Sequence, residues 1–119
     1  MLFAKFFDAI SSLTPVPPSQ ANLLAELDPD KIYVENVRSI LGVSTEHAKR
    51  ICETATRQGI FRRRVDVLCP DGTVAASAES EVHLPPTVRC WQETHGNYEP
   101  AEAETHLLQK DLYYILDGE

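Results

Sequence analysis

The sequence of 119 residues has no long apolar run. A helix that crosses a membrane needs roughly 18–20 apolar residues, and no stretch of the chain approaches that length. Residues 1–10 also lack the basic start, the extended apolar segment and the small-residue cleavage site of a signal peptide. We therefore expect a cytoplasmic protein that does not act at a membrane.

Cysteine is scarce and odd in number. The three cysteines are Cys52, Cys69 and Cys90. Small secreted domains that depend on disulfides carry a denser set of cysteines, usually an even number. The composition therefore predicts free cytosolic thiols rather than a disulfide scaffold.

The sequence also lacks the motifs of the common enzyme classes. Its five glycines are scattered and form no phosphate-binding loop. No HExxH pattern follows His47, and Cys52 falls on the expected buried face of a helix, which is a poor position for a nucleophile. The acidic residues show no pairing that suggests general acid–base chemistry. We predict a protein that is not an enzyme and that needs no cofactor.

Basic residues are few, and they are unevenly distributed. Lysine and arginine total 11 against 18 acidic residues, a net charge of −7, which argues against indiscriminate coating of nucleic acid. Six of the 11 lie within residues 44–64 beside only two acidic residues, so this segment carries +4 and the remainder −11. Such asymmetry is the strongest functional signal in the sequence.

The length permits one domain with short additions, and a hydrophobic content of 43% is that of a globular protein. Residues 1–13 carry apolar side chains at helical spacing, which predicts a short amphipathic helix. This helix either packs on its own domain or docks a partner protein, and its single lysine disfavours a membrane surface. The candidate docking residues are Phe3, Phe6, Phe7 and Ile10. A proline-rich spacer, residues 14–18, follows.

Residues 19–78 predict three helices and a β-hairpin. The expected elements are helices 20–27, 35–41 and 44–59, a short β-prone run at 32–34, and strands 60–68 and 73–76 joined by a turn at 70–72. The third helix should bury Ala48, Ile51, Cys52 and Ala55. Gly42 is expected to end the second helix in a left-handed conformation, and Ser44 to cap the third.

The segment Leu41-Gly42-Val43-Ser44 and the passage from Thr56 to Arg63 resemble the corresponding parts of the winged helix-turn-helix superfamily. The resemblance covers residues 19–78. It implies an α+β fold in which three helices precede a β-hairpin wing, with an N-terminal amphipathic helix and a small C-terminal β unit added here. The resemblance implies either a domain that binds DNA or, as in many winged helices, a protein-interaction module or dimerisation unit.

If the domain binds DNA, side chains near the start of the third helix reach base edges in the major groove. The candidates are Thr45, Glu46, His47, Lys49 and Arg50. Phosphates would be held by Arg57, Arg62, Arg63 and Arg64. In the competing interpretation this helix has the mixed charge of any soluble helix, and the consecutive arginines pair with acidic residues of the tail.

Residues 79–119 predict an acidic β tail. The expected order is a polar loop through residue 86, a strand at 87–91, a turn at 96–97, an acidic connector with Glu99, Glu102 and Glu104, and a closing strand at 107–116. The surroundings of Cys69 and Cys90 resemble a degenerate zinc ribbon whose second knuckle cysteines are missing. Zinc would need four ligands, and His83, His95 or His106 would have to complete the set. We predict no metal.

Together these patterns predict a non-enzymatic winged-helix protein that binds duplex DNA as a transcription regulator, in a dimer. The alternative is an adaptor subunit that docks a larger protein through residues 2–13 or the acidic tail. The combination of winged helix and ribbon-like tail resembles small bacterial proteins, some of them from regulatory or genome-conflict loci.

Overall fold

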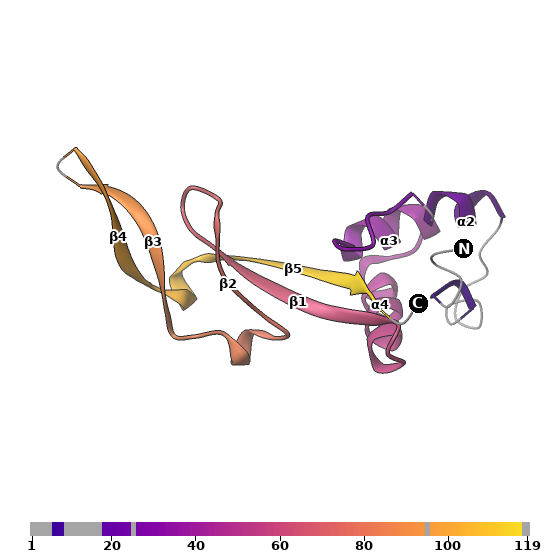
Figure 1. The fold of residues 1–119 in the computed structure, drawn as a ribbon. Coiled ribbons are helices and arrows are strands. Elements are labelled where there is room, and N and C mark those ends of the chain that lie inside the picture. Colours follow the sequence, from indigo (N-terminus) through magenta and orange to yellow (C-terminus); the bar gives the residue numbers. More distant parts are fainter. Residues whose placement is uncertain (1–5, 9–17, 25, 95, 118–119) are drawn as a thin grey trace. The chain divides into compact units, whose positions relative to one another are not determined.

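The structure is a computed structural model, and it describes residues 6–8, 18–24, 26–94 and 96–117. It confirms a mixed α+β protein (Figure 1). The elements are α2 (Pro18–Leu24), α3 (Val34–Leu41), α4 (Thr45–Arg57), β1 (Phe61–Leu68), β2 (Val74–Ala78), η1 (Glu81–His83), β3 (Thr87–Thr94), β4 (Asn97–Glu104), η2 (Thr105–Leu107) and β5 (Gln109–Leu116). No helix among the described residues is long and apolar enough to cross a membrane.

The chain forms two compact units. Unit 1 comprises Met1–Arg63 and Tyr113–Glu119, and unit 2 comprises Arg64–Leu112. The segments predicted from sequence, 19–78 and 79–119, are each continuous. Unit 1 instead consists of two separate parts of the chain, with unit 2 between them in sequence. The end of β5 belongs with the helices of unit 1 because Ile32 and Tyr114 pair in an isolated antiparallel bridge.

The core of unit 1 forms where three helices bury their apolar faces. In α4 the buried side chains are Ala48, Ile51, Cys52 and Ala55, as their spacing predicts. They cluster with Val37 and Leu41 of α3, Leu24 of α2, Phe61 of β1 and Tyr114 of β5. The helical face is therefore fixed by the apolar pattern, and the opposite face of α4 is left to solvent.

A tight turn joins α3 to α4. Gly42 has φ +67°, and its N–H donates to the carbonyl oxygen of Arg38 at 2.9 Å. Because the left-handed region of backbone conformation is costly for residues with a Cβ, glycine suits the position. Ser44 then caps α4, its Oγ accepting from the N–H of His47 at 3.1 Å. Both predicted roles are confirmed.

Residues 6–8 are helical and pack on unit 1. Phe6 is fully buried, and its ring stacks on that of Phe61 with centroids 4.6 Å apart. Phe7 packs against the same cluster. For these two residues the structure thus shows packing on the chain itself, the first of the two alternatives. Phe3 and Ile10 lie outside the described residues.

Two small antiparallel arrangements complete the fold. One sheet has the order β2-β1-β5, with β1 and β2 paired from Val65↔Ala78 to Leu68↔Val74. The other is the β3–β4 hairpin, paired from Thr87↔Glu104 to Thr94↔Asn97. The predicted acidic connector at 99–104 is wrong, because these residues form β4. Glu102 and Glu104 alternate with the half-buried Ala101 and Ala103, so this acidic segment has the alternation of a strand.

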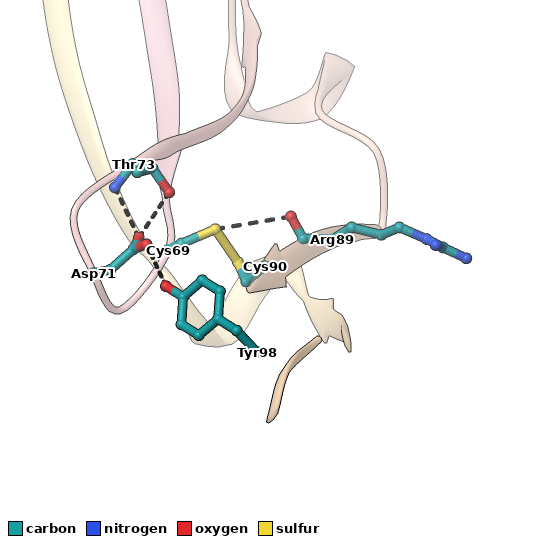
Figure 2. The surroundings of a disulfide bond; sticks show 6 residues. All are labelled: Cys69, Asp71, Thr73, Arg89, Cys90 and Tyr98. Atoms are coloured by element: carbon teal, nitrogen blue, oxygen red, sulfur yellow. Dashed lines mark hydrogen bonds between the residues drawn. A yellow bond between two sulfur atoms is a disulfide. The ribbon is translucent and has the colours of Figure 1, made fainter. Parts of the chain in front are cut away.

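The expectation of free thiols is wrong for Cys69 and Cys90. Their sulfurs form a disulfide across 21 positions of sequence, with Cα atoms 5.6 Å apart (Figure 2). Both residues are buried and join Val67 and Val88 in the small core of unit 2. The bond ties the end of β1 to β3. Cys52 remains a free, buried thiol.

Candidate nucleic-acid interface

Helix α4 presents most of the predicted base-reading residues on its outer side. Thr45, Glu46, Lys49 and Arg50 are exposed, whereas His47 is half-buried. The outward direction follows from the buried stripe, because residues on the opposite side of an amphipathic helix face solvent. The structure therefore brings four of the five predicted residues to one accessible surface at the start of α4.

Two cations of this surface are not neutralised by ion pairs. Within the described part of the chain, neither Lys49 nor Arg50 takes part in a salt bridge. Glu46 lies four residues before Arg50 and so shares its side of the helix. The outer surface thus combines two available cations with one carboxylate, and its net charge is modestly positive.

Arg63 does not belong to this surface. On β1 it alternates with Arg62 and Arg64 and so shares a face with Phe61 and Val65, both of which are buried. Its guanidinium forms an ion pair with Glu53 of α4, and Glu53 also accepts from the Tyr114 hydroxyl at 3.2 Å. The hydrogen bond to Glu53 raises the pKa of Arg63. Its charge is engaged inside unit 1, which argues against the predicted phosphate contact.

Arg57 and Arg62 remain exposed. Arg57 donates to Thr54 Oγ1 at 3.2 Å within α4, so its charge is not compensated by that bond. Arg62 lies 3.7 Å from Asp117, and both side chains are more than half exposed. A pair of this kind contributes little because solvent screens it. Both arginines can therefore reach a phosphate at small cost.

Arg64 belongs to unit 2 and is half-buried. It lies on the same face of β1 as Arg62 by alternation. Because the two units are separate bodies, Arg64 is not counted with the surface of α4.

The residues considered for zinc do not assemble a site. Cys69 and Cys90 are bonded to each other, so neither sulfur is available as a thiolate ligand. Among the described residues, no three His, Cys, Asp or Glu side chains are grouped to hold a metal ion. His83 instead bonds Ser80, with Nδ1 and Oγ 2.7 Å apart, and His95 lies outside the described residues.

Two buried side chains of unit 1, Cys52 of α4 and Tyr114 of β5, have raised pKa values. Burial raises the pKa of the Cys52 thiol to about 12, and the nearby Glu53 carboxylate adds to the shift. The pKa of Tyr114 also rises to about 12, chiefly through burial. A thiol with so high a pKa is not an activated nucleophile at neutral pH. This agrees with the placement of Cys52 on the buried side of its helix.

Comparisons with protein-family models, with curated proteins and with solved structures returned no match for this chain.

Sequence reasoning missed the partner of Arg63 and an exposed aromatic pair on the β3–β4 hairpin. Strand alternation could have shown that Arg63 faces inward, since it falls between two apolar residues that share its face, but it does not identify Glu53 as the partner. Trp91 and Tyr98, whose rings stack at 5.7 Å, are the second feature. No sequence signal reveals this pair without the hairpin register, because the acidic residues of β4 suggest a connector.

Proposed function

We propose that the chain is a winged-helix protein, without enzymatic activity, that binds duplex DNA through α4 as a regulator. The order of elements supports this interpretation. Three helices, with a tight turn at Gly42 between α3 and α4, precede the antiparallel β1–β2 pair. In this class of domain the second helix of the helix-turn-helix lies in the major groove. Helix α4 holds that position in the chain.

The observation that carries the proposal is that Lys49 and Arg50, in the first half of α4, are exposed and form no salt bridge with any other described residue. Base readout uses side chains near the start of the recognition helix. Arginine and lysine are the residues that most often contact guanine there. Thr45, which is also exposed, adds a hydroxyl that can accept or donate.

Phosphate contacts are assigned to Arg57 and Arg62. Both are exposed, and together with Lys49 and Arg50 they give about four cations for the DNA backbone and bases. Arg63 is not assigned a phosphate contact, because its ion pair with Glu53 would have to break first. The proposed surface lies entirely within unit 1.

Fluorescence anisotropy with labelled duplex DNA of random sequence at low salt tests this function. We expect wild-type protein to bind and the Lys49→Ala/Arg50→Ala variant to lose at least about tenfold in affinity. The matched control is Arg89→Ala/Lys110→Ala, which removes the same charge from unit 2 and should bind like wild type. Equal losses in both variants would refute an interface on α4. Stoichiometry at saturating protein shows whether the bound form is a dimer.

An adaptor role is the second candidate, and the composition of unit 2 favours it. Unit 2 has three basic residues against nine acidic ones, so it repels nucleic acid. An acidic unit 2 in the same chain as the exposed cations of α4 suits a protein that joins a partner to another target. Absence of DNA binding in the anisotropy experiment, with the fold intact, would leave this candidate in place.

A cytoplasmic location belongs to the proposal and is tested by the redox state of the cysteines. Cytosolic reductants keep most thiols reduced, while the structure holds Cys69 and Cys90 as a disulfide. Alkylation of denatured protein taken directly from cells distinguishes the two states. Three labelled cysteines would support a cytosolic pool, and labelling of Cys52 alone would indicate an oxidising compartment.

A further inference from the structure

The β3–β4 hairpin has one sheet face whose side chains are largely exposed in the described part of the chain. The strand register places Trp91 opposite Pro100 and Glu93 opposite Tyr98, so these four side chains share a face. Val88 and Cys90 alternate to the other face and are buried in the core of unit 2. The inner face thus has its partner, and the outer face is left exposed.

An aromatic pair dominates that outer face. Trp91 is 53% exposed and Tyr98 61% exposed, although both side chains are large. Their rings lie nearly parallel, with an interplanar angle of 5° and centroids 5.7 Å apart. Exposed Trp and Tyr are enriched where proteins bind other molecules, because they offer apolar area with few rotamers to freeze. Pro100 extends the same rigid apolar surface.

Negative charge surrounds the pair. The register puts Glu102 and Glu104 on the outer face with Glu93, and Arg89 is the one basic residue of the two strands there. Glu102 lies opposite Arg89, and its Oε1 also accepts from the Thr87 hydroxyl at 3.2 Å. The carboxylates exclude a nucleic acid from this face by repulsion and attract a cation.

We propose that this aromatic face binds an arginine-rich segment of a partner protein. A guanidinium group can stack on the face of Trp or Tyr and at the same time pair with a carboxylate in a bidentate manner. The hairpin offers both groups within one strand pair: Trp91 and Tyr98 for stacking, and Glu93, Glu102 and Glu104 for charge. The proposal concerns unit 2 and does not depend on DNA binding by α4.

The face is held in place before any partner binds. The disulfide anchors β3 through Cys90 (Figure 2). The Tyr98 hydroxyl contacts Asp71 Oδ2 at 3.5 Å, while Asp71 Oδ1 accepts from the N–H and the hydroxyl of Thr73 at 3.0 and 2.7 Å. These bonds to Thr73 lower the pKa of Asp71. A fixed platform binds with a smaller entropic cost.

Trp91 is the single tryptophan of the chain, so its fluorescence reports on the proposed face directly. We expect an oligoarginine peptide to change this fluorescence in a saturable manner at physiological ionic strength. Oligolysine should bind more weakly because ammonium groups stack less well. A labelled oligoarginine followed by anisotropy extends the measurement to Trp91→Ala, which should lose binding.

Charge variants separate specific docking from general attraction. Glu102→Gln/Glu104→Gln should weaken oligoarginine binding about tenfold or more, the loss of about one charge-assisted hydrogen bond. The control Glu79→Gln/Glu81→Gln removes the same charge from exposed positions of unit 2 outside the hairpin and should bind like wild type. Circular dichroism verifies that each variant is folded.

Three results would overturn the proposal. Equal weakening in both charge variants would show attraction to the acidic unit as a whole. Unchanged binding by Trp91→Ala would remove the aromatic pair from the interaction. A concentration-dependent change in Trp91 fluorescence without peptide, matched by dimers in ultracentrifugation, would assign the face to a second copy of the chain. Binding of DNA by Glu102→Gln/Glu104→Gln should equal that of wild type, so the two proposals fail separately.

Discussion

At the residue scale, the ion pair between Arg63 and Glu53 links β1 to α4, and the Tyr114 hydroxyl adds β5 to the same carboxylate. The pair lies at the margin of the core, with about a third of each side chain exposed. Water therefore screens it in part, but the neighbouring apolar residues make an unpaired carboxylate unfavourable. Arg63 is tolerated at an inward-facing position of the strand because Glu53 neutralises its charge there.

Replacing Arg63 tests this role. Arg63→Ala should lower the free energy of unfolding by about 1 kcal/mol, because Glu53 loses its cation. Urea unfolding followed by far-ultraviolet circular dichroism, which reports on the helices of unit 1, measures the change. Arg62→Ala is the control, and its exposed pair with Asp117 should contribute less than about 0.5 kcal/mol. A larger loss from Arg62 than from Arg63 would contradict the assignment.

Alkaline pH should destabilise unit 1. The pKa of Cys52 rises from 9.0 to about 12 and that of Tyr114 from 10.0 to about 12. Both groups stay protonated in the folded chain while the unfolded chain ionises them. Their stabilising effect is therefore complete below about pH 9 and declines between about pH 9 and 12. Unfolding midpoints across this range should fall in wild type and fall less steeply in Cys52→Ala. Parallel curves would show that folding does not raise the pKa of this thiol.

At the element scale, the α3–α4 turn sets the direction of the proposed recognition helix. The position of Gly42 is open, with no atom within 4 Å of an added Cβ, so only its φ of +67° opposes a larger residue. Gly42→Ala should therefore cost about 1 kcal/mol, the left-handed penalty less the entropic gain of alanine. Thermal unfolding measures it, with Ser39→Ala on the exposed side of α3 as the control. If Gly42→Ala left the stability unchanged, the backbone of the turn would have moved out of the left-handed conformation at no cost.

The disulfide is the main constraint on the β3–β4 hairpin. A hairpin of two strands is marginal alone, and the bond closes a loop of 21 positions. Loop-closure entropy assigns about 3 kcal/mol to such a bond. Cys69→Ser/Cys90→Ser should lower the unfolding free energy seen by Trp91 fluorescence by about that amount. The helical transition of unit 1 should shift less, and equal shifts would show that the two units unfold together.

Helices α3 and α4 could be predicted from sequence because each carries a local signal, whereas α2 spans Pro18–Leu24 and not the predicted 20–27. In α4 the apolar stripe, the Ser44 cap and the preceding Gly42 all agree. Strand β4 could not, because Glu99, Pro100 and Glu102 have low strand propensity and only the pairing with β3 places them. The disulfide was equally hidden. A spacing of 21 fits several arrangements, and only the folded chain brings the two sulfurs together.

The candidate surface was predictable in part. Lys49 and Arg50 lie where the helical period places them, opposite the buried stripe. The role of Arg63 could not be settled by composition, since its partner Glu53 is ten residues away on another element. The run of three arginines shows only that positive charge is concentrated in this part of the sequence. In β1, Arg62 and Arg64 lie on one face and Arg63 lies on the other.

At the scale of the whole molecule, the net charge of −7 divides between unlike units. Unit 2 holds nine acidic and three basic residues, whereas unit 1 holds nine acidic and eight basic residues. The DNA binding proposed for unit 1 therefore requires a few local cations, because the net charge of the protein opposes it. It should be strongly salt-dependent, and it should be lost when those cations are removed.

The most direct test is the salt dependence of duplex DNA binding by wild type and by Lys49→Ala/Arg50→Ala. With about four cations engaged, the logarithm of the association constant should fall with the logarithm of salt concentration with a slope of about −3 to −4. In the double variant the slope should shrink to about −2 and the affinity at low salt should drop at least about tenfold. Wild-type protein that fails to bind, or a variant with the same slope and affinity, would contradict the assignment of α4 as the DNA-binding helix.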